Sequence, residues 1–415
     1  MPGKEKSASN DGLMNPFNPF QPVKPINFVG RTDALKVFFK KVGEVQNNNV
    51  RIIFIRGERG IGKTSLAKYA RVMAERQFGI IGFHLFLGGR TGPKTKTEFI
   101  YSVVEKMIQA KSAVASLMKR IREYFEKYII EVDFGILNIK SKELSHSLPK
   151  NGSQFLKFIQ KFTEALYKGE EEDKGIMLIL DELDSVGLTP FFSDFIKEIN
   201  DTSASEDGSN HRILLVLCGT DFVYNKIIKE SHRMGNIMKV IDVNILEENE
   251  VKLFYKTTFN RLQIEILNDA LDLFSDYVNG SPQLMQLVGN VTFDWLNPRE
   301  PNRINYQIAS EGVKLASEEW GKKFLNRNQY EFLNNDEYKY FSSVLYTMET
   351  EIDFSEEELF NKISPSLINK AKNYLEFLSD MGVIEPLREK GGWKFRDKLL
   401  SVYVQNIGFI FLKTK

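Results

Sequence analysis

The chain has 415 residues, of which 42% are hydrophobic, and its formal net charge at pH 7 is +1. This length predicts two to three domains with cores of their own. The balanced charge excludes a global field that would attract nucleic acid or membranes, so any such contact must come from a local patch.

Cysteine content and the pattern of apolar segments predict the cellular compartment. The single cysteine, Cys218, excludes an intramolecular disulfide framework and fits a reducing environment. It follows an apolar run, which predicts a buried thiol. The polar N-terminus has no apolar signal region, and no stretch approaches the roughly 20 apolar residues of a membrane span. We therefore expect a cytoplasmic protein without a membrane partner.

Residues 1–26 are polar and then rich in proline, which predicts an extended N-terminal arm. Two interpretations of this arm stay open. A disordered leader explains its polarity, whereas Phe17 and Phe20 favour docking on the surface of a domain. The next residues, Phe28-Val29-Gly30-Arg31, precede a helix that is predicted to begin near Thr32 or Asp33.

A glycine-rich loop follows the apolar run at residues 52–55 and precedes a helical pattern. The loop, residues 57–64, reads Gly-Glu-Arg-Gly-Ile-Gly-Lys-Thr and fits G-x-x-x-x-G-K-[ST], the phosphate-binding P-loop or Walker A motif. Glycines let several backbone N–H groups converge on phosphate oxygens, and the helix N-terminus adds partial positive charge. We expect Lys63 to reach the β- and γ-phosphates and Thr64 to ligate Mg²⁺. The predicted nucleotide contacts of this stretch are Gly57, Arg59, Gly60, Ile61, Gly62, Lys63, Thr64 and Ser65.

Strands alternate with helices up to residue 246, which predicts βαβ units and a parallel sheet. After the P-loop, the predicted strands cover residues 80–87, 175–180, 213–217 and 240–246. The predicted helices cover residues 96–130, 154–167, 191–199 and 222–229. Residues 129–139 alternate in places, which predicts a hairpin.

Two carboxylates follow a continuous apolar run, which is typical of a central parallel strand. Asp181 matches the Walker B pattern, since a carboxylate at a strand tip beside a P-loop can hold Mg²⁺ or its water. Glu182 is the predicted general base for the attacking water. The alternative is an acidic pair that stabilises a helix N-terminus. Asp184 is either a supporting carboxylate or a helix cap.

Two further residues are catalytic candidates beside Lys63 and Glu182. Thr220 follows the strand at 213–217, where a sensor orients the attacking water, although a helix cap explains a threonine there as well. Arg233 follows the next helix, and a trans-acting arginine that neutralises transition-state charge comes from such a place. An ordinary surface arginine is the alternative for Arg233.

The pattern changes twice in the second half of the chain. Strands are predicted to stop at residue 247, and helices at 251–259, 264–278, 282–295 and 304–324 predict a helical lid with a connector, residues 247–328. Helices at 338–348, 355–360 and 365–381, followed by a hairpin at 383–396, predict a winged helix, residues 329–415. The part from residue 27 to 246 is the predicted ATPase core.

The order of these motifs resembles the STAND/AAA+ group of archaeal-type ATPases, which is related to origin-recognition initiators. The residues that carry the resemblance are FVGR at 28–31, GERGIGKTS at 57–65, LILDELD at 178–184, CGTD at 218–221 and GSP at 280–282. It implies an α/β P-loop NTPase fold with a parallel sheet, a helical lid and a C-terminal winged helix, with ATP and Mg²⁺ as cofactors. It also implies that Phe28, Val29 and Arg31 contact the adenine and that Pro282 begins a lid helix facing the nucleotide.

One departure from the resemblance concerns the lid helix. Origin-type members commonly place an arginine there, whereas residues 281–298 contain neither Lys nor Arg. This favours a nucleotide switch over a processive motor. The local alternative for the GSP motif is a helix cap at Ser281 with proline in the first turn.

Contact with double-stranded DNA is an open prediction for the winged helix. Its basic candidates are Lys370, Lys372, Arg388, Lys394 and Arg396. The first half of the domain is acidic, so phosphate contact would be confined to one face. Winged helices also contact proteins, and the basic run Lys119, Arg120 and Arg122 is an alternative patch.

The function predicted first is a slowly hydrolysing Mg-ATP switch that couples nucleotide state to a partner protein or DNA. The first alternative is a DNA-binding regulator in which ATP is a ligand with little turnover. The second is an ATP-driven homo-oligomer that recruits an effector, as in defence or mobile-element systems, an expectation that rests on family analogy.

Overall fold

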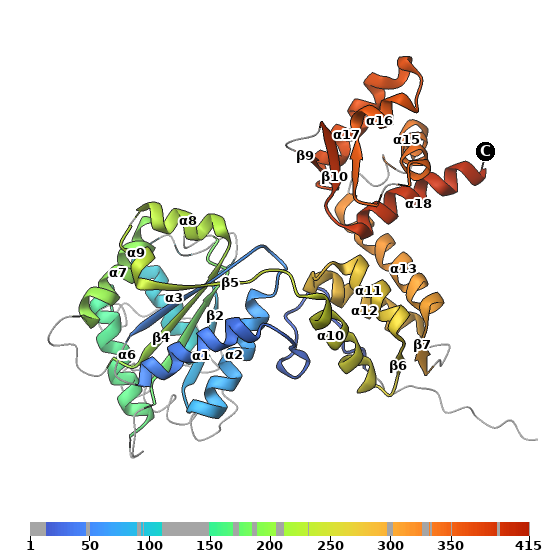
Figure 1. Cartoon of the computed structure of the whole chain (residues 1–415). Coiled ribbons are helices and arrows are strands. Elements are labelled where there is room, and N and C mark those ends of the chain that lie inside the picture. The colour runs from blue at the N-terminus through green and yellow to red at the C-terminus, as the bar shows by residue number, and fades with distance from the viewer. Residues whose placement is uncertain are drawn as a thin grey trace, which may run out of the picture. The chain divides into compact units, whose positions relative to one another are not determined.

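The computed structural model describes residues 14–46, 50–88, 93, 95–109, 149–168, 174–184, 189–204, 211–230, 232–296, 302–325, 332, 334–349, 351–387 and 391–414. The chain forms two compact units: a sheet unit, Lys24–Asn244, and a C-terminal unit that combines the residues up to Val23 with Ile245–Lys415 (Figure 1). The predicted helix beyond residue 109, the hairpin at 129–139, the basic run at 119–122 and Arg388 lie outside the described residues.

The sheet unit is built on five strands: β1 (Arg51–Arg56), β2 (Ile81–Phe86), β3 (Ile176–Asp181), β4 (Ile213–Gly219) and β5 (Met238–Asp242). Their order is β2-β3-β4-β1-β5, and each neighbouring pair is parallel. The predicted α/β class with a parallel sheet is confirmed. The order places β4 between β1 and β3, so the end of β4 lies between the P-loop and Asp181.

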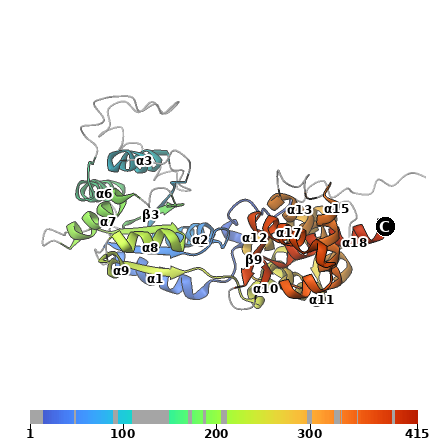
Figure 2. The same cartoon turned by 90° about the horizontal axis from the view of Figure 1, so that it is seen from above.

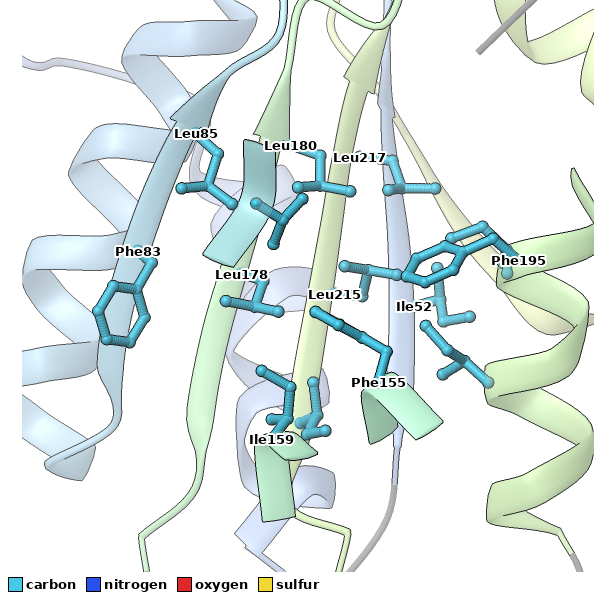
Figure 3. Packing of buried hydrophobic residues seen from close by; sticks show 14 of the residues in the cluster. Ile52, Phe83, Leu85, Phe155, Ile159, Leu178, Leu180, Phe195, Leu215 and Leu217 are labelled. Atoms are coloured by element: carbon cyan, nitrogen blue, oxygen red, sulfur yellow. The ribbon is translucent and has the colours of Figure 1, made fainter. Parts of the chain in front are cut away.

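Helices cover both faces of this sheet (Figure 2). One face carries α3 (Lys96–Gln109), α6 (Gly152–Leu166), α7 (Pro190–Ser203) and α8 (Asp221–Glu230), and the other carries α1 (Thr32–Gln46) and α2 (Lys63–Phe78). Alternate residues of each strand enter the two cores: Phe54 packs toward the first set of helices, and Ile53 toward the second. Figure 3 shows the first core, in which Phe155 and Phe195 lie over sheet residues such as Leu215.

One strand boundary differs from its prediction. The strand predicted at 240–246 is β5, which begins and ends earlier, at Met238 and Asp242. The prediction followed the apolar residues beyond Asp242. Val243 keeps one hydrogen bond to Arg56 O (2.8 Å), but Leu246 lies in the C-terminal unit and donates its N–H to Gly280 O (2.8 Å).

The predicted lid region of the C-terminal unit contains α10 (Glu248–Asn260), α11 (Asn268–Val278), α12 (Pro282–Leu296) and α13 (Tyr306–Leu325). The prediction that strands stop at residue 247 was wrong. Strands β6 (Glu265–Ile266) and β7 (Arg303–Ile304) pair in parallel and replace the predicted first residues of two helices. Strands of two residues are too short to leave an alternating pattern in the sequence.

The last part of the chain has the predicted order of helices and a hairpin. It contains α15 (Asp336–Thr347), α16 (Glu356–Asn361), the 3-10 turn Pro365–Leu367, α17 (Ile368–Asp380), β9 (Ile384–Leu387) and β10 (Gly392–Phe395). Two elements were not predicted: β8 (Asp353–Ser355), which completes the antiparallel sheet β8-β10-β9, and α18 (Lys398–Thr414). Close approaches at Gly321 and Gly408 let α18 pack on α13 and α15.

The two interpretations of the N-terminal arm have different outcomes at its two phenylalanines. Phe17 is buried, with 4% of its surface exposed, and docks on the C-terminal unit, whereas Phe20 is 61% exposed. Among the described residues, no helix has the length and apolar character that a membrane span requires.

Candidate nucleotide-binding site

The P-loop connects β1 to α2 with the backbone that its glycines predict. Gly60 and Gly62 have φ values of 79° and 101°, in the left-handed region that glycine adopts without strain. Gly62 is the residue directly before α2, whose first residue is Lys63. The first turn of α2 therefore follows directly on the loop, and the N-terminus of a helix suits an anion.

Lys63 is drawn back over its own loop. Its Nζ donates to Gly57 O at 2.9 Å and to Glu58 O at 2.7 Å. Burial lowers the pKa of Lys63, and the carboxylates of Asp184 and Asp181 partly offset this effect. An ammonium group held by two neutral carbonyls can exchange them for phosphate oxygens, whose negative charge makes them stronger acceptors.

Asp181 ends β3, and hydrogen bonds hold both of its carboxylate oxygens. His84 Nε2 lies 2.9 Å from Asp181 Oδ2, and the N–H of Glu182 donates to Oδ1 at 3.0 Å. The Thr64 hydroxyl lies near the same carboxylate and lowers its pKa. Burial raises the pKa of Asp181, but the bonds from His84 and Thr64 outweigh it, so the pKa lies below its usual value. A hydroxyl and an ionised carboxylate that lie near each other fit Mg²⁺, which in phosphate sites takes one or two protein oxygens together with phosphate and water.

Glu182 follows with a left-handed backbone, φ 54°, which is rare for a residue with a side chain. Its carboxylate lies against Gly88, where an added Cβ would come within 2.0 Å of Oε2. Desolvation raises the pKa of Glu182, and repulsion from Asp181 and Asp184 adds to this effect. A raised pKa brings a carboxylate closer to the proton affinity that a general base needs.

Asp184 links three parts of the site. Arg59 Nη2, from the P-loop, lies 2.7 Å from Asp184 Oδ2, and the Thr220 hydroxyl donates to Oδ1 at 3.3 Å. Since β4 lies between β1 and β3, Thr220 at its end stands between the P-loop and the Asp181-Glu182 pair. Asp184 therefore holds the side chain of Thr220, the predicted sensor.

The segment at residues 28–31 lies against α2 and the P-loop. The ring of Phe28 stacks on Tyr69 of α2, with 4.4 Å between the ring centroids, and Val29 is half-buried. Arg31 has a left-handed backbone, φ 61°, and its Nη2 donates to Ile61 O at 3.1 Å. The segment is thus attached to the loop that would hold the phosphates.

His84 was not among the site residues predicted from the sequence. It lies in β2 opposite Ile179, on the face of the sheet that also carries Asp181. The signal in the sequence was a polar residue inside the apolar run of residues 80–87. That signal could not be assigned without the register of β2 and β3.

The comparisons with known proteins place the fold. No family model and no curated protein matches the chain. Among solved structures, the Walker-type ATPase PABY2304 of Pyrococcus abyssi is 14% identical, over 93% of this chain and 99% of its own, with a TM-score of 0.49. The ORC2 protein of Aeropyrum pernix, in ADPNP–ADP complexes, is 12% identical over 92% and 94%, with a TM-score of 0.52. The chain has the AAA+ P-loop ATPase fold. The resemblance stated from the sequence is thus confirmed for the fold.

Arg233 lies toward the amino ends of the strands of the AAA+ sheet, whereas the P-loop lies at their carboxyl ends. The P-loop follows the carboxyl end of β1, and α8 runs back from the carboxyl end of β4 over ten residues, about 15 Å, before Arg233 and the start of β5. Arg233 is exposed, and within the described chain its guanidinium has no hydrogen bond or ion pair. The topology therefore separates Arg233 from the P-loop of its own sheet.

Pro282 belongs to the C-terminal unit, where it is the first residue of α12. The N–H of Leu284 donates to Ser281 Oγ at 3.5 Å, so the local cap that explains the GSP motif is present. The described residues of α12 contain no Lys or Arg.

Most of the described cations of the winged helix are engaged within the chain. Lys370 pairs with Glu337, Lys372 lies over the Phe360 ring at 5.8 Å, and Arg396 lies over Phe324 of α13 at 5.2 Å. Lys394 lies on β10 and is half-buried.

Proposed function

We propose that the chain is a Mg²⁺-dependent ATPase that uses the P-loop, Asp181 and Glu182 to bind and hydrolyse ATP. The observation that carries the proposal is that Asp181, at the tip of β3, lies near Thr64 of the P-loop helix, while Asp184 joins Arg59 of the P-loop to Thr220. A hydroxyl and a carboxylate from these two motifs meet where Mg²⁺ is held in P-loop ATPases.

Each side chain then has a separate role. Lys63 leaves the Gly57 and Glu58 carbonyls to neutralise the β- and γ-phosphates, while Thr64 and Asp181 would hold Mg²⁺, which supplies charge neutralisation between those phosphates. Glu182 accepts the proton of the attacking water.

Three residues support these steps. Thr220, fixed by Asp184, orients the water. In this proposal Phe28 and Arg31 close the base side of the site, supported by the bond from Arg31 to Ile61 O of the P-loop.

The switch role rests on the C-terminal unit. The chain leaves the sheet unit at Asn244 and continues into a lid region whose described helix α12 offers no cation to the γ-phosphate. A lid of this kind favours slow turnover that reports nucleotide state over rapid mechanical work. The winged helix is the proposed output toward a partner. The buried thiol of Cys218 suits a reducing compartment, so we place the protein in the cytoplasm.

Assembly through Arg233 is part of the same proposal. An exposed arginine at the amino ends of the strands can act on the nucleotide bound to a second copy, and not on the nucleotide bound to its own P-loop. ATP-dependent self-association would therefore complete the site.

Duplex DNA is the second candidate partner, and the observation in its favour is the winged-helix arrangement of α15, α16, α17 and the sheet β8-β10-β9. Among the candidates that the structure describes, the engagement of Lys370, Lys372 and Arg396 leaves Lys394 as the cation to test. We expect Lys394→Glu to lower salt-dependent binding of duplex DNA, and a chain that binds no DNA at low salt would remove this candidate.

ATP binding and turnover of the whole chain, with and without Mg²⁺, test the proposed function. Lys63→Ala should weaken ATP binding at least about tenfold and abolish turnover, because the phosphates lose their nearest cation. Lys68→Ala, on the same helix, is the control and should behave like the wild type. A wild-type chain that binds no ATP would refute the proposal.

A further inference from the structure

The N-terminal arm contains the same triplet twice, since residues 15–20 read Asn-Pro-Phe-Asn-Pro-Phe. In each triplet the Asn side-chain oxygen accepts the backbone N–H of the Phe two residues later, at 2.9 Å for Asn15 and Phe17 and at 3.2 Å for Asn18 and Phe20. This is an Asx turn, in which the side chain fixes the backbone locally. The arm therefore presents two copies of one preformed shape.

The first triplet occupies an aromatic groove of the C-terminal unit, formed by α10 and α12. The Phe17 ring lies 5.0 Å from that of Phe259 and 5.9 Å from that of Phe254, measured between centroids. Gly289 makes room for it, because an added Cβ there would come within 2.4 Å of the Phe17 ring. The groove thus has a cavity shaped for one aromatic ring.

Polar side chains of α12 form hydrogen bonds with the asparagine of the triplet and with the residue that follows it. Asn15 Nδ2 donates to Asp294 Oδ1 at 2.7 Å and to Asn290 Oδ1 at 3.0 Å. The N–H of Asn18, the residue after Phe17, donates to Gln286 Oε1 at 2.8 Å. Residues 286, 290 and 294 are spaced by four and share one face of the helix, so a single polar stripe binds the asparagine amide and the N–H that follows the ring.

The second triplet has the same turn but lies outside the groove. Phe20 is 61% exposed, and Lys323 Nζ lies over its ring at 4.4 Å. The contacts that hold the first triplet require an asparagine amide, a phenylalanine two residues later and a backbone N–H after it. Asn18, Phe20 and Gln21 supply the same three groups.

We propose that the α10–α12 groove is a binding site for Asn-Pro-Phe segments and that it accepts either triplet of the arm. Exchange of one triplet for the other changes the length of chain between the groove and Lys24, where the sheet unit begins, from seven residues (24 − 17) to four (24 − 20). At full extension this is a change from about 25 Å to about 14 Å. The arm is then a strap of two lengths. The site belongs to the C-terminal unit and does not depend on the proposed ATPase activity.

Labelled peptides of residues 14–23, added to the full chain carrying Phe17→Ala and Phe20→Ala, test the site directly. One peptide carries Phe20→Ala and keeps the first triplet, one carries Phe17→Ala and keeps the second, and one carries both. The first two should bind within about tenfold of each other, and the third should bind at least about tenfold more weakly than either. The wild-type chain, whose groove is filled, should bind none of them as tightly, and Gly289→Leu added to the double variant should abolish binding.

The peptide results overturn the proposal in three ways: when neither single-triplet peptide binds, when the peptide without phenylalanine binds equally well, or when only the first triplet binds. Hydrogen exchange of α12 provides a second measurement in the full chain. Phe17→Ala alone should leave exchange within about threefold of the wild type, because the second triplet takes the groove, whereas the double variant should exchange at least about tenfold faster. Equal acceleration in the single and double variants would contradict exchange between triplets.

Discussion

Nε2 of His84 lies 2.9 Å from Oδ2 of Asp181, across the neighbouring strands β2 and β3. Because an ionised carboxylate only accepts hydrogen bonds, Nε2 is the donor. The bond fixes one oxygen of Asp181 and holds its pKa low, together with the bond from Thr64. His84 is therefore a positioning residue for the proposed Mg²⁺ ligand.

His84→Leu should weaken Mg²⁺-dependent ADP binding about tenfold, because Asp181 loses a donor and its orientation. Binding without Mg²⁺ should change little. His84→Gln places an amide N–H near the position of Nε2 and should restore most of the effect. Titration of Mn²⁺ in the presence of ADP measures this directly, with the exposed His232→Leu as control. Identical Mn²⁺ affinity in His84→Leu and the wild type would rule out a positioning role.

Thr220→Ala should lower the turnover number about tenfold or more and leave nucleotide affinity nearly unchanged, because the hydroxyl acts on the water and not on the bound phosphates. Thr220→Ser keeps the hydroxyl beside Asp184 and should retain most activity. Steady-state rates over a range of ATP concentrations separate the two effects. A loss of affinity without a loss of rate would assign Thr220 to binding instead.

Subunit mixing tests Arg233. Arg233→Ala and Glu182→Gln should each be inactive alone, because each removes one part of a site shared between copies. Mixed, they should recover activity, since an Arg233→Ala copy keeps its own Glu182 and receives Arg233 from the other copy. Turnover is measured against mixing ratio. A mixture no more active than the sum of its parts would mean that Arg233 does not act in trans.

Asp397 precedes α18 and accepts from Trp320 Nε1 and from the N–H of Leu400, each at 2.9 Å. Burial raises the pKa of Asp397, and these bonds oppose the shift only in part. A carboxyl whose folded pKa exceeds its unfolded value favours the fold most at low pH, and that contribution is lost as pH rises through the folded pKa.

Asp397→Asn removes the buried charge but has a single acceptor oxygen, so it keeps only one of these two contacts and should lie between the wild type and Asp397→Ala in stability at pH 7. Asp397→Ala leaves both donors unpaired and should cost about 1–3 kcal/mol. Urea unfolding at pH 5 and pH 8 measures both variants. An Asn variant as unstable as the Ala variant would show that the remaining acceptor contact contributes nothing to stability.

The parts of the fold that the sequence predicted well carry their information locally. The P-loop glycines, the acidic pair after an apolar run and the helices with a single apolar face are readable because neighbouring residues determine them. Phe17 and Phe20 of the arm were named as docking candidates, but only the groove between α10 and α12 explains why Phe17 is buried and Phe20 is not.

What could not be predicted depends on pairing between distant segments. The His84 contact needs the register of β2 against β3. The two-residue strands β6 and β7 are defined by the pairing of Glu265 with Arg303 and of Ile266 with Ile304. Helix α18 was missed because its apolar residues occur on all of its faces and mark no single buried side. Its buried positions follow from packing on α13 and α15.

The proposed ATPase mechanism depends most on Glu182 as the base that activates water. Turnover of Mg-ATP by Glu182→Gln, measured together with equilibrium ATP binding, tests this role directly. The mechanism predicts that ATP binding stays within about threefold of the wild type while turnover falls at least about a hundredfold, the scale of a lost general base. Equal turnover by Glu182→Gln and the wild type would contradict it.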